Sequence, residues 1–195
     1  MADQLYLSYK MHNPMAQQVV RGLEKLLRAF PFSKLTKGAT TLRILAVRIG
    51  EPALYEESYE APFDPELALS AIREFAAADV ALELEAWWEM WQFEKGEWKL
   101  LPARVTMSAF CPEYESDRED DIRVEFGIDT HFLPQPKLPN FLFMARSNIK
   151  SLLHLVHELD AAFPAAVRTL WSESGANFAA RLQESLMAGD SAAAE

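Results

Sequence analysis

Two long stretches of alternating apolar residues, 80–94 and 97–111, constrain the fold of this chain more than any other feature. Alternation of this kind predicts β-strands. Only Lys95-Gly96 lies between the two stretches, and a two-residue connection that contains glycine is typical of a tight hairpin turn. The sequence therefore predicts one long antiparallel hairpin. Four of the chain's five tryptophans lie in residues 86–98, so this hairpin is rich in Trp.

The register of the predicted hairpin follows from its turn. If Phe93 pairs with Trp98, every other pair along the two strands is fixed. Neighbouring side chains of a strand point to opposite faces. One face then receives only apolar pairs, among them Trp88 opposite Ala103. We expect this face, including Trp88, to lie in the core.

The opposite face of the hairpin combines tryptophans with carboxylates. The residues of this face are Glu83, Glu85, Trp87, Glu89, Trp91, Phe93, Trp98 and Arg104. Trp87 and Arg104 face each other across the strands, which suits a cation–π contact. An adjoining strand over residues 122–131 is expected to add Ile122, Val124, Phe126 and Ile128 to the core, and Arg123, Glu125, Asp129 and His131 to the second face.

Shorter patterns place the remaining elements. Further strands are predicted over residues 4–10, 40–49, 53–60 and 140–145, with 53–60 at a sheet edge. One helix is expected to begin at Asn13-Pro14 and to end before Pro31, and a second to begin at Asp64-Pro65. Near the C-terminus, the predicted elements are a third helix from Ser147 to Pro164, a fourth with Val167, Leu170 and Trp171, and a last one through Phe178, Leu182 and Leu186.

This order of elements predicts a single α+β domain over residues 1–188, followed by a flexible tail at 189–195. Its core is expected to be an antiparallel-rich sheet that contains the hairpin 80–94/97–111. Two helices cover one face of this sheet, and a helical segment follows at the C-terminus. The first six elements match the order of a ferredoxin-like split βαβ unit.

Charge and cysteine content exclude several classes of protein. The formal net charge is −10 and no dense basic stripe is present, which is contrary to what nucleic-acid binding requires. The single cysteine, Cys111, excludes an internal disulfide, and we expect it to be a small buried hydrophobic residue rather than a nucleophile.

The N-terminus does not resemble a signal peptide, and no apolar stretch is long enough to span a bilayer. The expected location is therefore the cytoplasm, away from the membrane.

Few residues suggest catalysis, and we expect no cofactor and no enzymatic activity. His154 and His157 share a helical face, and with Asp129 and His131 they are weak candidates for a metal site. Both histidines point away from the apolar stripe of their helix, so we expect them to be ordinary surface residues. The acidic segment 113–121 lacks the spacing of a calcium-binding EF-hand. We expect it to be a solvated, mobile loop that is able to attract a basic partner. The segment 171–175 is not a GxSxG nucleophile motif, and no P-loop or dinucleotide-binding motif is present.

The acidic and aromatic face of the hairpin is thus the predicted binding site, with Trp87, Glu89, Trp91, Trp98, Arg104, Glu83 and Glu85 as its residues. Three interpretations compete. In the first, the C-terminal helices cover the aromatic end, and the face has only a structural role. In the second, the face binds a basic or apolar protein partner, or a second copy of the chain. Alternatively, it binds a cationic, lipophilic small molecule between aromatic rings and carboxylates. A metal-dependent enzyme is the weakest hypothesis.

Overall fold

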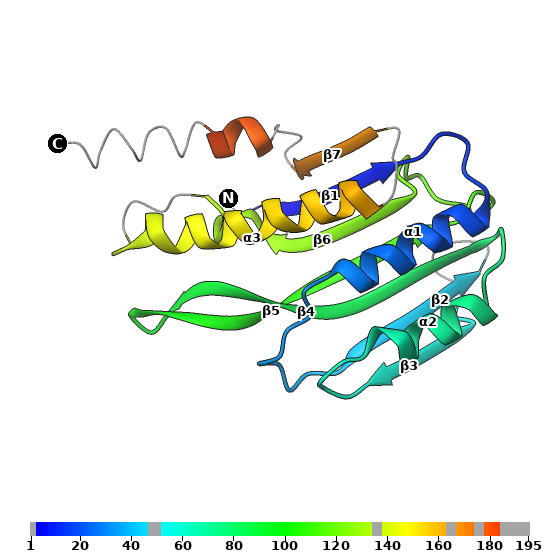
Figure 1. The fold of residues 1–195 in the computed structure, drawn as a ribbon, viewed down its shortest axis with the longest axis horizontal. Helices are drawn as coiled ribbons and strands as arrows, with labels where there is room; N and C mark the ends of the chain where they lie inside the picture. Colours follow the sequence, from blue (N-terminus) through cyan, green and yellow to red (C-terminus); the bar gives the residue numbers. More distant parts are fainter. Residues whose placement is uncertain (1–2, 47–51, 134–137, 163–166, 174–177, 184–195) are drawn as a thin grey trace.

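The computed structural model describes residues 3–46, 52–133, 138–162, 167–173 and 178–183. Seven strands form one sheet in the order β3-β2-β4-β5-β6-β1-β7, shown in Figure 1. They are β1 (Gln4–Lys10), β2 (Thr40–Ala46), β3 (Tyr55–Tyr59), β4 (Val80–Glu94), β5 (Glu97–Phe110), β6 (Ile122–Ile128) and β7 (Val167–Ser172). All neighbouring strands are antiparallel. The predicted α+β class and the antiparallel sheet are confirmed.

The first six elements follow the β-α-β-β-α-β order that the sequence predicted, but their strands are not paired as in a ferredoxin-like unit. A split βαβ unit needs its first strand in parallel contact with another strand of the unit. Here β1 pairs antiparallel with β6 on one side and with β7 on the other. The first and the last strands of the chain therefore meet at one end of the sheet, and β2–β3 form the other end.

Three helices pack on the same face of the sheet: α1 (Ala16–Ala29), α2 (Pro65–Glu74) and α3 (Phe141–Ala162) (Figure 1). The start of α2 is as predicted, because the Asp64 carboxylate accepts a hydrogen bond from the backbone N–H of Glu66 at 3.0 Å. The start of α1 lies later than predicted, with Met15 as its N-cap. Asn13 instead adopts a left-handed conformation with φ 44°.

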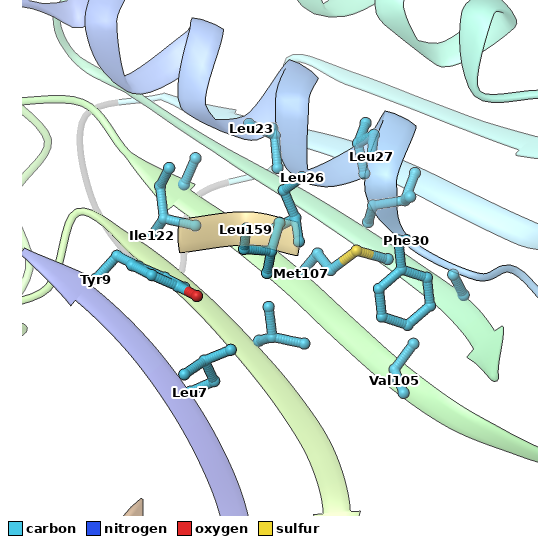
Figure 2. Close-up of a cluster of buried hydrophobic side chains, with 14 of the residues drawn as sticks. Leu7, Tyr9, Leu23, Leu26, Leu27, Phe30, Val105, Met107, Ile122 and Leu159 are labelled. Atoms are coloured by element: carbon cyan, nitrogen blue, oxygen red, sulfur yellow. The ribbon is translucent and has the colours of Figure 1, made fainter. Parts of the chain in front are cut away.

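The core lies between these helices and one face of the sheet. Figure 2 shows how α1 and α3 meet the central strands, with Leu23 and Leu26 of α1 near Leu159 of α3 and Met107 of β5. Leu23, Leu26, Leu159 and Met107 are fully buried, and each apolar side chain removed from water in this way contributes about 1.5–3 kcal/mol. Tyr9 is also buried, and burial raises the pKa of its hydroxyl to about 12.

The predicted register of the hairpin is confirmed. Phe93 pairs with Trp98 and Trp88 pairs with Ala103, as the position of the turn requires. Lys95 and Gly96 both have positive φ, at 52° and 88°. This is the geometry of a type I′ turn, which matches the twist of the flanking strands. Trp88 is only 3% exposed and therefore belongs to the core, as predicted.

The C-terminal third departs from the sequence-based prediction. Residues 140–145 were expected to form a strand and Ser147 to cap a helix, but α3 begins at Phe141 and runs without a break to Ala162. The fourth helix expected around Val167 is instead strand β7, which pairs with β1 over its whole length. Residues 178–183 are helical as predicted, whereas Leu186 and the tail 189–195 lie outside the described residues. Pairing with the distant strand β1 accounts for the change at Val167–Ser172, and local periodicity does not report such a partner.

Strand β6 also ends earlier than predicted. Gly127 has φ 76°, which breaks the alternation of side chains, and residues Asp129–His131 form a 3-10 turn, η1. Ile122, Val124 and Phe126 are buried as expected, but Ile128 is 39% exposed instead of lying in the core. Asp129 and His131 therefore do not continue the face that begins with Arg123 and Glu125.

None of the helices in the described ranges is long and apolar enough to cross a membrane.

The predicted arrangement of helices over one face and the helical C-terminal segment are both present, with α3 added to the covering layer. The other face of the sheet carries no helix among the described residues, and we call it the open face.

Candidate functional site

The open face consists of the strand side chains that point away from α1, α2 and α3. On β4 and β5 its members are Glu83, Glu85, Trp87, Glu89, Trp91, Phe93, Trp98, Leu100 and Arg104, and on β6, β1 and β7 they are Arg123, Glu125, Tyr6, Ser8, Lys10, Thr169 and Trp171. The structure thus brings together on one surface every residue of the predicted binding site. These residues fall into three regions: the middle of β4 and β5, the aromatic end of this hairpin, and the part of the sheet where β6, β1 and β7 meet.

Trp87 anchors the loop between α1 and β2. Its indole Nε1 donates to the backbone carbonyl of Ala39 at 2.9 Å, and its ring lies directly against Gly38. A Cβ atom at Gly38 would come within 2.6 Å of the ring, so no larger residue fits there without displacing Trp87. The predicted contact with Arg104 is present, with the guanidinium carbon 5.5 Å from the ring centroid. The indole of Trp87 is consequently half-buried rather than free.

Glu89 holds the same loop by its carboxylate. The oxygen Oε1 accepts hydrogen bonds from the Ser33 hydroxyl at 3.2 Å and from the backbone N–H groups of Lys34 at 2.7 Å and Leu35 at 3.2 Å. Charged acceptors make stronger hydrogen bonds than neutral ones. Glu89 therefore has a structural role in closing the loop, which the sequence pattern did not indicate.

The acidic centre of the open face is paired with arginine. Arg43 of β2 lies 2.6 Å from the Glu85 carboxylate, 3.4 Å from that of Glu83 and 3.0 Å from that of Glu56. Hydrogen bonds to Glu85 and Glu56 raise the pKa of the Arg43 guanidinium further above its usual value. Arg104 approaches Glu85 from the other side at 3.6 Å. The centre is a network of charges across the four strands β2, β3, β4 and β5, in which cations partly neutralise the acids.

The aromatic end of the open face encloses a pocket of about 400 Å³. Its walls include Trp91, Phe93, Glu94, Trp98, His131 and Phe141. The Trp98 ring lies between Phe93 and Phe141, at centroid distances of 5.3 and 5.6 Å, and its Nε1 donates to the Pro139 carbonyl at 2.6 Å. Burial lowers the pKa of His131, so its imidazole is neutral at pH 7. Phe141, the first residue of α3, therefore forms one wall of this pocket and contacts Trp98.

Asn148 of α3 fixes the position of this pocket. Its side-chain amide donates to the carbonyls of Trp91 at 3.0 Å and His131 at 2.9 Å, and its Oδ1 accepts from the Trp91 N–H at 2.9 Å. Asn148 is buried, so these three hydrogen bonds are shielded from water. They join α3, β4 and η1 at one point.

The third region, where β6, β1 and β7 meet, was missed at the sequence level. Trp171 stacks on Tyr6 with ring centroids 4.4 Å apart, and the Arg123 guanidinium lies 5.4 Å from each ring. Trp171 Nε1 donates to the Ser8 hydroxyl at 3.0 Å, and this hydroxyl donates to the buried Asp120 carboxylate at 2.7 Å. The signal was Val167, Thr169 and Trp171, β-favouring residues that alternate along what was predicted to be a helix.

Arg123 completes this region with a bidentate ion pair. Its Nε and Nη2 donate to the two carboxylate oxygens of Asp120 at 2.6 and 2.8 Å. Asp121 beside it accepts from the backbone N–H of Met11 at 2.6 Å and lies 3.3 Å from Lys10 Nζ. The segment 113–121 is therefore solvent-exposed, as predicted, over much of its length but not at its C-terminal end. Its last two acids are buried anchors, while Glu115, Asp117 and Glu119 remain exposed.

Glu125 is the one carboxylate at the middle of the open face without a hydrogen-bond or ion-pair partner among the described residues. Burial raises the pKa of this carboxyl group, an effect that the more distant Arg118 and Arg123 only partly offset. Its neighbours across the strands are Tyr6 and Thr106. The protonated form of Glu125 is thus favoured relative to an exposed glutamate.

The weak metal candidates are not gathered in the structure. Asp129 is buried, accepts from the Asp3 N–H at 3.2 Å and lies 3.2 Å from Arg181. His154 and His157 are exposed on α3. Across the described ranges, no group of three or more His, Cys, Asp or Glu side chains is placed to hold a metal ion.

Cys111 is buried, as predicted. It is 2% exposed, and burial raises the pKa of its thiol to about 11, so the nucleophilic thiolate is scarce at neutral pH.

Comparisons of this chain with models of protein families, with curated proteins and with solved structures find no match. The residues and their geometry are therefore the whole basis for assigning a function.

Proposed function

We propose that this chain is a non-enzymatic binding protein whose open face receives a basic segment of a partner protein, in the cytoplasm. The observation that carries the proposal is the asymmetry of the sheet. Three helices cover one face, while the other face is without a helix in the described ranges and carries aromatic and charged side chains (Figure 1). Aromatic and arginine side chains supply much of the binding energy at protein interfaces.

The charge of the chain favours a basic partner over a second copy. The formal net charge is −10, and two copies facing each other would bring like charges together. At the centre of the open face, Glu83 and Glu85 share Arg43, and Glu125 has no cation in contact. A Lys or Arg side chain of the partner is therefore expected at Glu125, with its apolar residues against Trp91 and Leu100.

The non-enzymatic part of the proposal rests on how the acids are used. Glu83 and Glu85 are engaged by Arg43, and Glu89 accepts three hydrogen bonds from the loop at residues 33–35. A general acid or base must be able to exchange its proton with a substrate. These three carboxylates are held in structural contacts and do not meet that requirement.

A matched pair of leucine variants tests this proposal. Leu100 lies on the open face and is 38% exposed, whereas Leu67 on α2 is 57% exposed and lies on the helical side. Once affinity capture has identified a partner, we expect Leu100→Arg to weaken its binding about tenfold or more and Leu67→Arg to leave it unchanged. Equal loss in both variants, or a captured chain that is acidic, would contradict the proposal.

A second candidate function is the binding of a cationic amphiphile in the aromatic pocket. The specific observation in its favour is that Trp91, Phe93 and Trp98 line one pocket of about 400 Å³ together with Glu94 and a neutral His131. Aromatic faces attract quaternary ammonium groups, and a carboxylate supplies the countercharge.

Benzyltrimethylammonium titrated against the Trp fluorescence of the protein tests this candidate. We expect saturable quenching that Trp91→Phe weakens and Glu94→Gln reduces, with Glu113→Gln on the remote acidic segment as the control. Non-saturable quenching, or the same response from all three variants, would remove this function from consideration.

A further inference from the structure

A second pocket lies on the open face, at the end of the sheet opposite the β2–β3 edge. It has a volume of about 730 Å³, and its lining residues come from β7, β1, β6 and the connection between β5 and β6. The three strands lie side by side at this end of the sheet (Figure 1). This volume is within the range of pockets that bind small organic molecules. Neither proposed function above uses the pocket.

The charges around this pocket are arranged unlike those of the rest of the chain. Three cations line it, Lys10, Arg118 and Arg123. Its two acids are Asp120, which is neutralised by the bidentate pair with Arg123, and the exposed Glu119. Lys10 is likewise paired with Asp121 at 3.3 Å, so Arg118 is the cation of this pocket that has no ion-pair partner among the described residues. An unpaired cation at a concave site attracts anions to that location.

Arg118 is the residue best placed to bind an anion. Its guanidinium lies over the Phe110 ring, 4.9 Å from the centroid, which restricts its position. Its side chain makes no ion pair or hydrogen bond with any described residue, although the chain is rich in acids. A restricted guanidinium with unused donors matches the two oxygens of a carboxylate. Lys10, which is 49% exposed and 3.3 Å from Asp121, can add a second donor.

The remaining wall of the pocket is apolar and rigid. Trp171 is fixed by stacking on Tyr6 and by its hydrogen bond to Ser8, so its indole is held in place before any ligand arrives. Val167 and Thr169 extend this wall along β7. Fixed aromatic walls favour a flat apolar ligand because little conformational freedom is lost on binding.

We propose that this pocket binds a small organic anion with a flat apolar body, of the aromatic carboxylate class. The carboxylate pairs with Arg118 and Lys10, and the ring lies against Trp171 and Val167. The buried network of Ser8, Asp120 and Arg123 acts as the floor that keeps Trp171 and the charged side chains in register. No covalent step is involved.

Isothermal titration calorimetry with naphthalene-2-carboxylate, indole-3-acetate and benzoate tests this proposal on the full chain. We expect at least one of the three to bind saturably. The neutral carboxamide of that compound lacks the negative charge, and inorganic phosphate lacks the flat apolar body. Each is therefore expected to bind about tenfold more weakly than the carboxylate or not at all. The proposal is overturned if none of the three carboxylates binds, or if carboxamide or phosphate binds as tightly.

Variants locate the binding site. Arg118→Gln is expected to weaken the carboxylate about tenfold, and Thr169→Trp, which fills the pocket from an exposed strand position, to abolish binding. Arg21→Gln removes one exposed positive charge from α1 and serves as the matched control. Binding that survives both Arg118→Gln and Thr169→Trp contradicts the assignment to this pocket, as does an equal loss in Arg21→Gln. Unchanged thermal unfolding of each variant shows that a loss is local.

Discussion

Trp87 and Trp88 are neighbours in the chain, yet they belong to two faces of the sheet that are built on different principles. Trp88 lies in the core and contacts Phe30 and Phe126 at ring-centroid distances of 5.8 and 5.3 Å. Trp87 lies on the open face, where it holds a loop by one hydrogen bond and stacks with Arg104. The helical face is stabilised by burial of apolar area. The open face is organised by individual polar contacts between strands and loops.

The difference indicates where a change of sequence is expected to alter stability most. Core side chains pack against many neighbours at once, so their loss leaves a cavity. Side chains of the open face have few partners each, so their removal changes a local surface while the sheet remains. A surface of this kind is suited to recognition. Variants on both faces probe this contrast.

The largest effect is expected from the two adjacent tryptophans. Trp88→Ala should lower the free energy of unfolding by about 3–5 kcal/mol, because it empties a buried aromatic site. Trp87→Ala should cost about 1–2 kcal/mol, since a half-buried ring and one hydrogen bond are lost. Urea denaturation of the two variants measures both values, and equal losses would refute the distinction between the faces.

Asn148→Ala is expected to cost about 2–3 kcal/mol, because backbone groups of Trp91 and His131 lose their partners in a site shielded from water. Ser147→Ala, one residue earlier on α3, is the control and should change stability by less than about 0.5 kcal/mol. Thermal unfolding of Asn148→Ala and Ser147→Ala measures the change in stability of each variant. Alanine favours a helix more than either residue it replaces, so a loss of similar size in both variants would show that the three hydrogen bonds of Asn148 do not explain the result.

A smaller and local effect is expected from Glu89→Ala. Removing the acceptor of three hydrogen bonds should cost about 1–2 kcal/mol and release the loop at residues 33–39. Hydrogen exchange followed by NMR should show faster exchange at the amides of Lys34 and Leu35. Amides in the centre of β5 should keep their protection. Unchanged exchange at Lys34 and Leu35 would mean that Glu89 does not hold the loop.

The smallest effect is expected at Glu125, and its sign depends on pH. Because burial raises its pKa in the folded protein, ionisation of Glu125 opposes folding. The stability it contributes is complete below its unfolded pKa, about 4.3, and is lost as the pH rises through the folded value. Glu125→Gln should therefore be more stable than the unchanged chain at pH 7, with the difference vanishing in acid. A destabilised variant at pH 7 would show that the carboxylate has a favourable partner.

The sequence was sufficient for the parts of the fold that depend on local pattern. The hairpin turn at Lys95-Gly96 determined the pairing of 80–94 with 97–111, so both faces could be assigned in advance. The cap at Asp64 was equally local. The pairing of β7 could not be predicted in this way, because its partner β1 lies more than 150 residues away, and without that partner the alternation of Val167, Thr169 and Trp171 was too short to decide against a helix.

The candidate site was predictable to a similar extent. Alternation placed Trp87, Glu89 and Trp91 on one surface, but it did not show that Glu89 is occupied by the loop at residues 33–35. The buried positions of Asp120 and Asp121 were also missed, because an acidic run usually indicates a solvated loop. Their partners Ser8, Arg123 and Lys10 come from two other strands.

The central claim, that the open face is the binding face, is tested most directly by photo-crosslinking in cells. A photoreactive amino acid is placed at Leu100 on the open face, and in separate proteins at Leu67 on α2 and Leu153 on α3, all of which are exposed. We predict that Leu100 alone forms a covalent adduct with one basic protein. Adducts from Leu67 or Leu153 but not from Leu100, or an adduct of Leu100 with a second copy of this chain, would contradict the claim.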